Sequence, residues 1–179
     1  ILCTTFNQEQ YLRDALEGFL LQKTTFPFEV ISHDDASTDG TAAVVEEYLE
    51  RFPDVTYVRE KTNCYSRGLS VARSLREICS GKYIAYCEGD DYWISEAKLQ
   101  RQYDFMESHG DFAICLHNAV VADLINRSAY LSEPDGADKE KSVTELIVEG
   151  GGRVNPTASF FVRKEALNDV ALGPVEDHL

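Results

Sequence analysis

The stretch CEGDDYW, residues 87–93, places three carboxylates within four positions: Glu88, Asp90 and Asp91. It directly follows residues 82–86, KYIAY, an apolar run that predicts a buried strand. Carboxylates held this close repel one another and resist ionisation unless a cation lies among them. Oxygen ligands favour a hard ion, Mg²⁺ or Mn²⁺, which usually also binds phosphate oxygens of a substrate. The stretch therefore predicts a site for a metal-bound nucleotide or diphosphate.

The elements that must position these acids alternate along the chain. Apolar runs predict strands, and apolar side chains at helical spacing predict helices: strands at 1–5, 28–33, 55–59 and 83–87, and helices near 12–22, 41–52, 69–80 and 95–106. We expect Asn7 and Ser95 to cap the helices that follow them. This alternation predicts an α/β fold, with a mainly parallel, Rossmann-like sheet and helices on both faces.

A second acidic pair, Asp34 and Asp35, follows the second predicted strand. Ligands of an open α/β sheet bind beyond the carboxyl ends of its strands. We therefore expect this pair and the three acids of residues 88–91 to converge in one cleft. No Walker loop or GxGxxG is present, so the sequence does not predict a glycine-rich phosphate cradle.

The pattern changes after about residue 111 into a mixed C-terminal part. Residues 111–124 predict one longer strand, and residues 132–141 are polar and predict a mobile loop. Ser142 with Glu145 is a capping-box pattern for a short helix. Residues 157–163 predict a late strand.

Charge and cysteine content limit the class of protein. The 179 residues hold 17 basic and 31 acidic side chains, a formal charge of −14, which argues against a nucleic-acid backbone or an anionic membrane as partner. Five cysteines without a CxxC pair predict reduced thiols in a cytoplasmic protein. The chain begins at Ile1 inside an apparent strand, so we expect a fragment of a longer protein. A signal, or an anchor at the inner face of the membrane, is left open.

Plainer interpretations exist for both acidic stretches. HDDASTDGT, residues 33–41, also fits a turn followed by a helix cap. Residues 88–93 also fit a solvated turn, in which Tyr92 and Trp93 are expected to pack against the core rather than stack on a ligand. The four histidines show no metal-ligand spacing.

Three segments together resemble a known family. They are TTFNQEQYLRDALEGFLLQ (4–22), HDDASTDGT (33–41), and SGKYIAYCEGDDYW (80–93) followed by KLQRQ (98–102). Their order and spacing resemble the family 2 inverting glycosyltransferases with the GT-A fold, over roughly the first 110 residues. The CEGDDYW form resembles a bacterial subgroup that decorates surface polysaccharide.

The resemblance implies a nucleotide-sugar donor, most often a UDP-sugar. Asp90 is the implied ligand of a divalent metal, Mn²⁺ or Mg²⁺, that bridges the diphosphate. Two departures are Glu88, where the family usually has Asp, and the loop NCYSRG (63–68), which is longer than usual. The candidate nucleotide-sugar-binding residues are Thr5, Phe6, Glu9, Asp35, Arg73, Glu88, Gly89, Asp90 and Asp91.

The resemblance also implies a general base that deprotonates the acceptor hydroxyl. Asp177 is the candidate, with Glu176 as the fallback, and an ordinary acidic helix start near a chain end is the alternative. Residues 155–159, NPTAS, are expected to line the acceptor side. We expect a single catalytic domain over 1–179, with a nucleotide-sugar-binding half (1–110) and a truncated acceptor-side half (111–179).

The implied partners are the donor and a saccharide or lipid-linked saccharide acceptor, with no nucleic acid. Association with the membrane surface through regions outside this sequence is left open. Two other function classes are alternatives to a glycosyltransferase. A nucleotidyltransferase usually has a glycine-rich N-terminal loop with a basic residue, which residues 1–10 lack. The third class is a nucleotide-binding module without catalytic activity.

Overall fold

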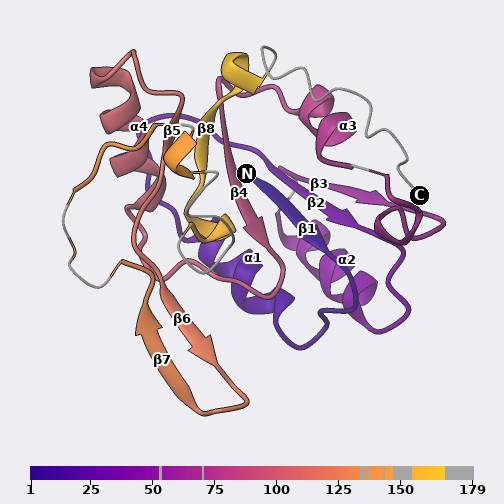
Figure 1. Cartoon of the computed structure of the whole chain (residues 1–179). Coiled ribbons are helices and arrows are strands. Elements are labelled where there is room, and N and C mark those ends of the chain that lie inside the picture. Colours follow the sequence, from indigo (N-terminus) through magenta and orange to yellow (C-terminus); the bar gives the residue numbers. More distant parts are fainter. Residues whose placement is uncertain are drawn as a thin grey trace.

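The computed structural model describes residues 1–52, 54–69, 71–133, 136, 138–142, 144–146 and 155–167, with backbone only for 71–74. Its main sheet has six strands in the order β3-β2-β1-β4-β8-β5 (Figure 1). The first four are parallel: β1 (Leu2–Thr5), β2 (Val30–Asp34), β3 (Val55–Arg59) and β4 (Tyr83–Glu88). Two strands from the second half extend the sheet, since β8 (Phe161–Arg163) runs antiparallel to both β4 and β5 (Ile114–Cys115). The predicted mainly parallel sheet is confirmed.

Helices cover both faces of this sheet. The larger core cluster packs α1 (Leu12–Leu20), α2 (Thr41–Arg51) and α4 (Lys98–Ser108) on one face, and the smaller cluster packs α3 (Val71–Ile78) on the other. Neighbouring residues of a strand point to opposite faces. Cys3 accordingly belongs to the first cluster and Leu2 to the second. None of the five cysteines forms a disulfide, as predicted.

The second half is less regular than the sequence predicts. Residues 111–124 are not one strand, because β5 ends at Cys115 and β6 (Val120–Asp123) pairs only with β7 (Ser128–Leu131) in a separate hairpin. The late strand is shorter than expected, since Thr157–Ser159 form a 3₁₀ turn in which the Ser159 hydroxyl donates to the Pro156 carbonyl. Two further 3₁₀ turns span Tyr65–Arg67 and Lys164–Leu167.

Two predicted helix caps are wrong, and one is confirmed. Helix α1 begins after Tyr11, so Asn7 does not cap it, and α4 begins after Ala97 without a side-chain cap from Ser95. The capping box is present, because Ser142 N donates to the Glu145 carboxylate and Glu145 N donates to the Ser142 hydroxyl.

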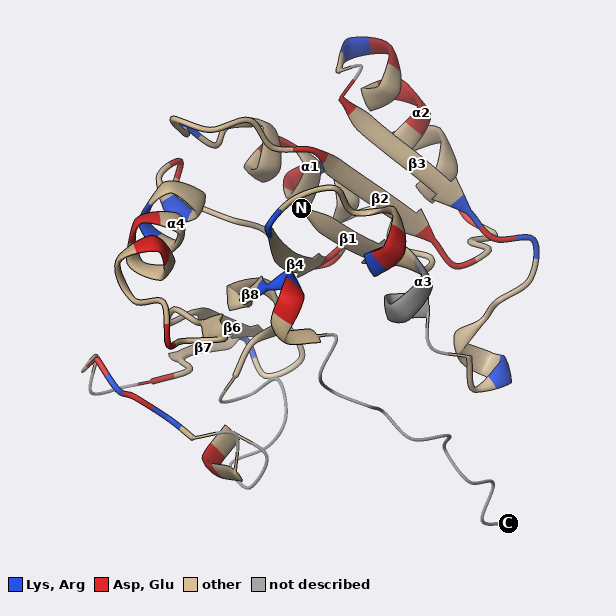
Figure 2. Cartoon of the chain, turned by 90° about the horizontal axis from the view of Figure 1, so that it is seen from above, with Lys and Arg blue, Asp and Glu red and all other residues tan. Residues whose placement is uncertain are grey.

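Acidic side chains outnumber basic ones over the whole molecule, and the basic ones are scattered among them (Figure 2). Within the described residues, no helix has the length and apolar composition that crossing a bilayer requires.

Gly18 marks the closest approach of a helix to the turn after β4. A Cβ built on Gly18 would lie 2.9 Å from the carbonyl oxygen and 3.0 Å from the amide nitrogen of Trp93. Both atoms belong to the backbone, so neither can rotate away. Helix α1 therefore requires glycine at this position.

We predict that Gly18→Ala destabilises the protein by about 1–3 kcal/mol. The same change at an unhindered helix position would stabilise it by roughly 1 kcal/mol. Urea unfolding measures the difference, with Ala43→Gly on the exposed face of α2 as the control for helix propensity. A stabilising Gly18→Ala change would show that the helix and the turn are not in close contact.

Candidate functional site

The turn after β4 is pressed against the end of β1. The parallel register pairs Thr4 with Glu88, and the Gly89 amide continues it by donating to the Thr4 carbonyl at 2.9 Å. A Cβ at Gly89 would lie 2.6 Å from Gln8 Oε1 and 2.8 Å from Thr5 Oγ1. Only glycine fits here without displacing both side chains. The acids on either side of Gly89 are held at the edge of the sheet by this contact.

Two buried oxygens beside Gly89 have no hydrogen-bond partner among the described residues: Thr5 Oγ1 and Gln8 Oε1. Buried polar atoms normally have a partner, and an unsatisfied one costs about 1–3 kcal/mol. Neither Gln8 nor this pairing was singled out from the sequence. The only feature of the sequence that pointed to this pairing was the position of Gln8 just beyond the first predicted strand.

Two acids of the turn, Glu88 and Asp91, have a raised pKa. Loss of hydration, and then the charges of Asp90 and Asp91, raise the pKa of Glu88 above its ordinary value. Loss of hydration and the charge of Asp90 raise the pKa of Asp91 in the same way. Loss of hydration is the larger cause of both shifts and the neighbouring negative charge is the smaller one, and a cation placed here would offset both by stabilising the ionised forms. The residues present therefore fit a hard divalent ion.

The expected convergence of five carboxylates is wrong. Asp34 is fully buried and accepts hydrogen bonds from the Ser37 amide at 2.7 Å and the Tyr57 hydroxyl at 2.8 Å. Within the described part of the chain, no three Asp, Glu, His or Cys side chains are close enough to hold a metal ion. Both carboxylate oxygens of Asp34 accept hydrogen bonds within the protein. A metal ion bound at the turn after β4 would therefore need ligands other than a cluster of these carboxylates.

Asp35 organises the longer loop after β3. Its carboxylate accepts hydrogen bonds from the backbone amides of Cys64 at 2.6 Å and Tyr65 at 3.0 Å. Burial acts to raise the pKa of Asp35, but these hydrogen bonds outweigh it, and the pKa is lowered. The Asn63 side chain adds a hydrogen bond to the Asp35 carbonyl at 3.0 Å. The NCYSRG loop is thus attached to one of the candidate binding residues.

Asn7 and Glu9 connect the end of β1 to the start of α2. Asn7 has a positive φ of 53°, and its side-chain oxygen accepts from the Thr38 amide at 2.8 Å, which explains why it does not cap α1. The Glu9 carboxylate accepts from the Gly40 amide at 3.0 Å. This bond shows that Glu9 has a structural role that needs no ligand. Its role in nucleotide-sugar binding stays a prediction. Phe6, between these residues and Thr5, is 45% exposed.

The aromatic pair of the turn divides into one buried and one exposed residue. Trp93 is buried and donates from Nε1 to the Ala158 carbonyl at 2.9 Å, as predicted for a core residue. Tyr92 is 58% exposed, so the prediction that it packs against the core is wrong. The Trp93 bond joins the turn to residues 155–159, on the side where the acceptor was expected.

The Lys98 amine packs against the face of the Trp93 ring. Lys98 was not identified from the sequence as a residue of the site. It is only 6% exposed, with Nζ 3.8 Å from the centre of the Trp93 ring and 2.8 Å from Gln102 Oε1. Gln102 in turn donates from Nε2 to the Ser159 carbonyl at 2.8 Å. The only signal was that Lys98 and Gln102 are the first and last residues of KLQRQ.

Three predicted site residues cannot be placed. The structure describes the backbone of Arg73 in α3 but not its side chain. Glu176 and Asp177 lie outside the described residues.

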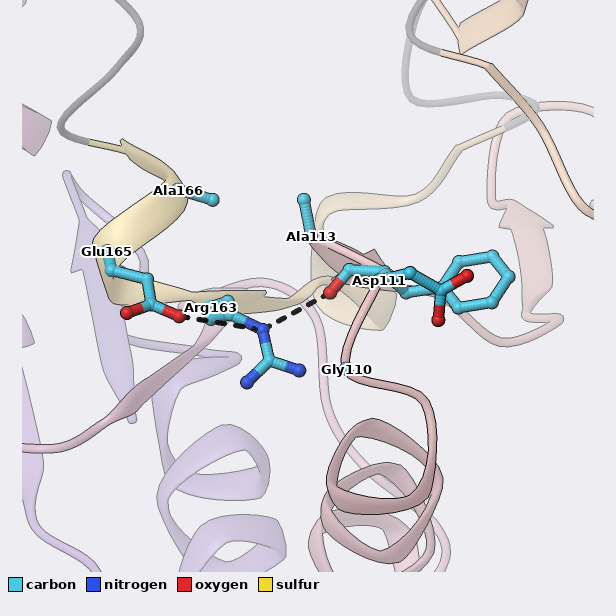
Figure 3. A pocket seen from close by; sticks show the side chains of 7 residues that line it. Gly110, Asp111, Ala113, Arg163, Glu165 and Ala166 are labelled. Carbon is cyan, nitrogen blue, oxygen red and sulfur yellow. Dashed lines mark hydrogen bonds and ion pairs between the residues drawn. The ribbon is translucent and has the colours of Figure 1, made fainter.

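A hollow of about 500 Å³ lies at the opposite edge of the sheet, lined by residues 110–113, 163, 165 and 166 (Figure 3). Arg163 pairs with Tyr83, the first residue of β4, so this hollow is at the far end of β4 from Glu88. The Arg163 guanidinium already donates to the carbonyls of Phe112 and Met106 and to the Tyr83 hydroxyl. The hollow is therefore separate from the candidate site. The Arg163 guanidinium that lines it already makes hydrogen bonds within the protein.

One family model matches most of the chain. The model described as "Glycosyl transferase family 2" matches residues 1–170. The uncharacterized protein Rv1520 of Mycobacterium tuberculosis is 40% identical over 121 residues, which is 65% of this chain and 34% of that protein. The Escherichia coli protein named UDP-Glc:alpha-D-GlcNAc-diphosphoundecaprenol beta-1,3-glucosyltransferase WfaP is 29% identical over 136 residues, 75% of this chain and 51% of that protein. The chain thus spans about a third to a half of the length of these relatives.

Among solved structures, Staphylococcus aureus TarS 1–349 in complex with UDP superposes with a TM-score of 0.64 at 22% identity. The match covers 94% of this chain and 47% of TarS 1–349. At this identity the likeness shows a common fold.

We predict that Lys98 makes stability depend on pH. Burial lowers the pKa of Lys98 from its ordinary value of 10.5 to about 7. Between these values the unfolded chain binds a proton that the folded chain has lost, so the free energy of unfolding rises with pH. Lys98→Met removes this contribution. From pH 7 to pH 9 the wild type should gain about 2 kcal/mol relative to the variant, measured by urea unfolding.

The exposed Lys61→Met variant serves as the control and should keep the wild-type slope. Parallel pH profiles for wild type and Lys98→Met would contradict a buried amine that loses its proton near pH 7.

Proposed function

Because the chain belongs to glycosyl transferase family 2 and has the GT-A fold, we propose that the whole protein transfers a sugar from a nucleotide-sugar donor to a saccharide acceptor. The observation that carries this proposal is the turn at Gly89. It presents Asp90 at the edge of the sheet beside two oxygens, Thr5 Oγ1 and Gln8 Oε1, that have no hydrogen-bond partner in the described part of the chain. This arrangement supports a polar ligand with hydroxyl and phosphate groups next to the acids.

The donor side is built from the first half of the chain, residues 1–110. Thr5 and Phe6 form one wall of the nucleotide pocket, and Asp35 lies at its base-binding end. Asp35 keeps its negative charge because two backbone amides donate to it, and its pKa is lowered. An ionised carboxylate accepts hydrogen bonds, which suits the ring N–H of uracil. We therefore propose a UDP-sugar as the donor, with Glu88 nearest the ribose.

Asp90 would hold a divalent ion, Mn²⁺ or Mg²⁺. Such an ion, when bound, neutralises the charge that develops on the departing diphosphate. The described residues offer no cluster of three ligands, so the remaining positions fall to substrate oxygens and water. Mg²⁺ and Mn²⁺ accept such sharing, because they are often held by one or two carboxylates plus phosphates. Asp91 keeps the turn negative and braces it through its amide, which donates to the Glu88 carbonyl at 3.1 Å. Arg73 would face the diphosphate.

The acceptor side is the second half of the chain, residues 111–179. Trp93 joins the metal-binding turn to residues 155–159, so the donor and acceptor walls are held together. Asp177 acts as the general base that removes the acceptor proton, with Glu176 as the fallback. The acceptor oxygen then attacks the anomeric carbon opposite the leaving group, which inverts its configuration. We propose that residues 1–179 act as one catalytic domain.

The acceptor class is supported by a relative rather than by this chain. WfaP is named for transfer to a saccharide carried on diphosphoundecaprenol. We propose a lipid-linked saccharide acceptor in the synthesis of a cell-surface polysaccharide, with the protein working at the cytoplasmic face of the membrane. The resemblance of CEGDDYW to bacterial enzymes of surface polysaccharides agrees with this.

We predict that Asp90→Asn lowers transfer and donor hydrolysis by on the order of a hundredfold or more, because the charge that holds the ion is lost. Release of UDP from UDP-sugars in Mn²⁺ is the measurement. Asp111→Asn, at the opposite edge of the sheet, is the matched control and should keep wild-type rates. Full activity of Asp90→Asn would overturn the metal assignment. Release of pyrophosphate from a nucleoside triphosphate and a sugar 1-phosphate, with no release of UDP from UDP-sugars, would favour a nucleotidyltransferase.

A separate prediction concerns the base. Asp177→Asn should keep UDP binding, measured by calorimetry, and lose at least about a hundredfold in transfer. Glu176→Gln should retain most activity. The reverse pattern would assign the base to Glu176. UDP binding with no turnover by the full-length wild type on any acceptor would indicate a module without catalytic activity.

A further inference from the structure

The β6–β7 hairpin ends in two exposed aliphatic side chains. Leu124 is 71% and Ile125 is 93% exposed at the turn between the strands. Figure 1 shows the hairpin projecting from the body of the protein, on the side toward which β4 runs. Single exposed aliphatic residues are common on protein surfaces, but two adjacent ones at a projecting tip need an explanation.

The tip is shaped by hydrogen bonds to the Asp123 carboxylate, which satisfy two of its backbone amides. The Asp123 carboxylate accepts from the amides of Ile125 and Asn126, each at 3.0 Å, and from the Asn126 side chain at 2.7 Å. Arg127 closes the turn with a φ of 51°. Backbone groups that are already satisfied lose less when a segment leaves water for an apolar phase. The turn thus presents Leu124 and Ile125 in a fixed arrangement.

The base of the hairpin is equally fixed. The Asn118 side-chain oxygen accepts from the amides of Ala119 and Glu133 and from the Ser132 hydroxyl, at 2.8–3.0 Å. The Asn118 side-chain nitrogen donates to the Glu133 carbonyl at 2.7 Å. A two-stranded hairpin alone is only marginally stable in water. These bonds close the base of the hairpin and add to the pairing of its two strands.

The shape of the tip disfavours a protein as its occupant. A stable protein interface buries roughly 800 Å² on each partner, and two aliphatic side chains on a projecting turn fall far short of that area. A lipid bilayer needs no such area, because its fluid surface closes around a small apolar wedge. The contact that fits a projecting tip is therefore with lipid.

The charge of the hairpin agrees with this choice. The whole chain has a formal charge of −14, whereas residues 118–132, NAVVADLINRSAYLS, hold one Asp and one Arg. This segment can approach an anionic surface that would repel the rest of the protein. Within the described part of the chain, the structure gives Arg127 no carboxylate partner, so its guanidinium is available to a lipid phosphate.

We propose that the β6–β7 hairpin docks the protein on a bilayer surface, with Leu124 and Ile125 inserted at the boundary of the acyl chains and Arg127 on a lipid phosphate. This goes beyond the proposed sugar transfer, since it states which part of the chain meets the membrane. The proposal rests on the proposed function in one respect, because that function gives a reason for docking. A lipid-linked acceptor must reach the edge of the sheet at which β4 ends.

Flotation with vesicles tests this proposal on the full-length protein. The vesicles contain phosphatidylethanolamine and phosphatidylglycerol at 3:1, with no acceptor lipid. We expect weak, reversible binding by the wild type. Leu124→Ser/Ile125→Ser should lower the partition coefficient by about tenfold or more. Arg127→Gln should lower it by about fivefold on these vesicles. Leu21→Ser, which removes an exposed leucine at the end of α1, is the matched control and should bind as the wild type does.

Donor hydrolysis without lipid is measured on the same variants and should be unchanged, so a failure of docking can be told from a failure of the proposed function. Three results would overturn the proposal. They are a wild type that does not float, a double variant that floats as well as the wild type, and a double variant that changes its oligomeric mass in analytical ultracentrifugation. The last result would indicate that the tip pairs with a second copy.

Discussion

The candidate site depends on one backbone contact, between Gly89 and the end of β1. The Gly89 amide extends the parallel ladder by one hydrogen bond beyond Glu88, and the absence of a Cβ lets Thr5 and Gln8 pack directly on it. The chain must then reverse, which places Glu88 and Asp90 on either side of the turn at the edge of the sheet. Three carboxylates within four residues are tolerable because the sheet directs them outward, where an ion and substrate can meet them.

Residues behind the turn keep it in place at some cost in stability. Trp93 is held by its bond to Ala158, by Lys98 below its ring, and by an edge contact with Phe19 at 4.8 Å between ring centres. Among the described residues, the Lys98 amine contacts the Trp93 ring and the Gln102 side-chain oxygen and no carboxylate, and burying an amine without a carboxylate is unfavourable. A core built only for stability would place an aliphatic residue here. Through Gln102, the lysine joins Trp93 to Ser159, and the proposed function uses this connection between the turn after β4 and residues 155–159.

Local patterns predicted the parallel strands of the sheet because each one is a short run of apolar residues. Such a run can be recognised in the sequence without knowing which strand it pairs with. Local patterns failed where a side chain bonds across the fold. Asn7 resembles a helix cap but bonds to Thr38, and Asp34 resembles a ligand but is bound by Ser37 and Tyr57. Residues 111–124 look like one strand in the sequence. In the structure the Asn118 side chain interrupts them by closing a hairpin, and its partners Ser132 and Glu133 lie beyond this range, where the local pattern does not reveal them. The resemblance supplied the residue roles, and those of Arg73, Glu176 and Asp177 remain predictions.

In the proposed site the protein supplies one metal ligand, and substrate oxygens and water supply the rest. Electron paramagnetic resonance of free Mn²⁺ tests this arrangement most directly, in a titration of the full-length protein with and without UDP. Because no cluster of three ligands exists among the described residues, Mn²⁺ alone should bind weakly, and UDP should tighten its binding by at least about tenfold, with the same gain for UDP when Mn²⁺ is present. Tight Mn²⁺ binding without UDP, or UDP binding that ignores Mn²⁺, would contradict the account.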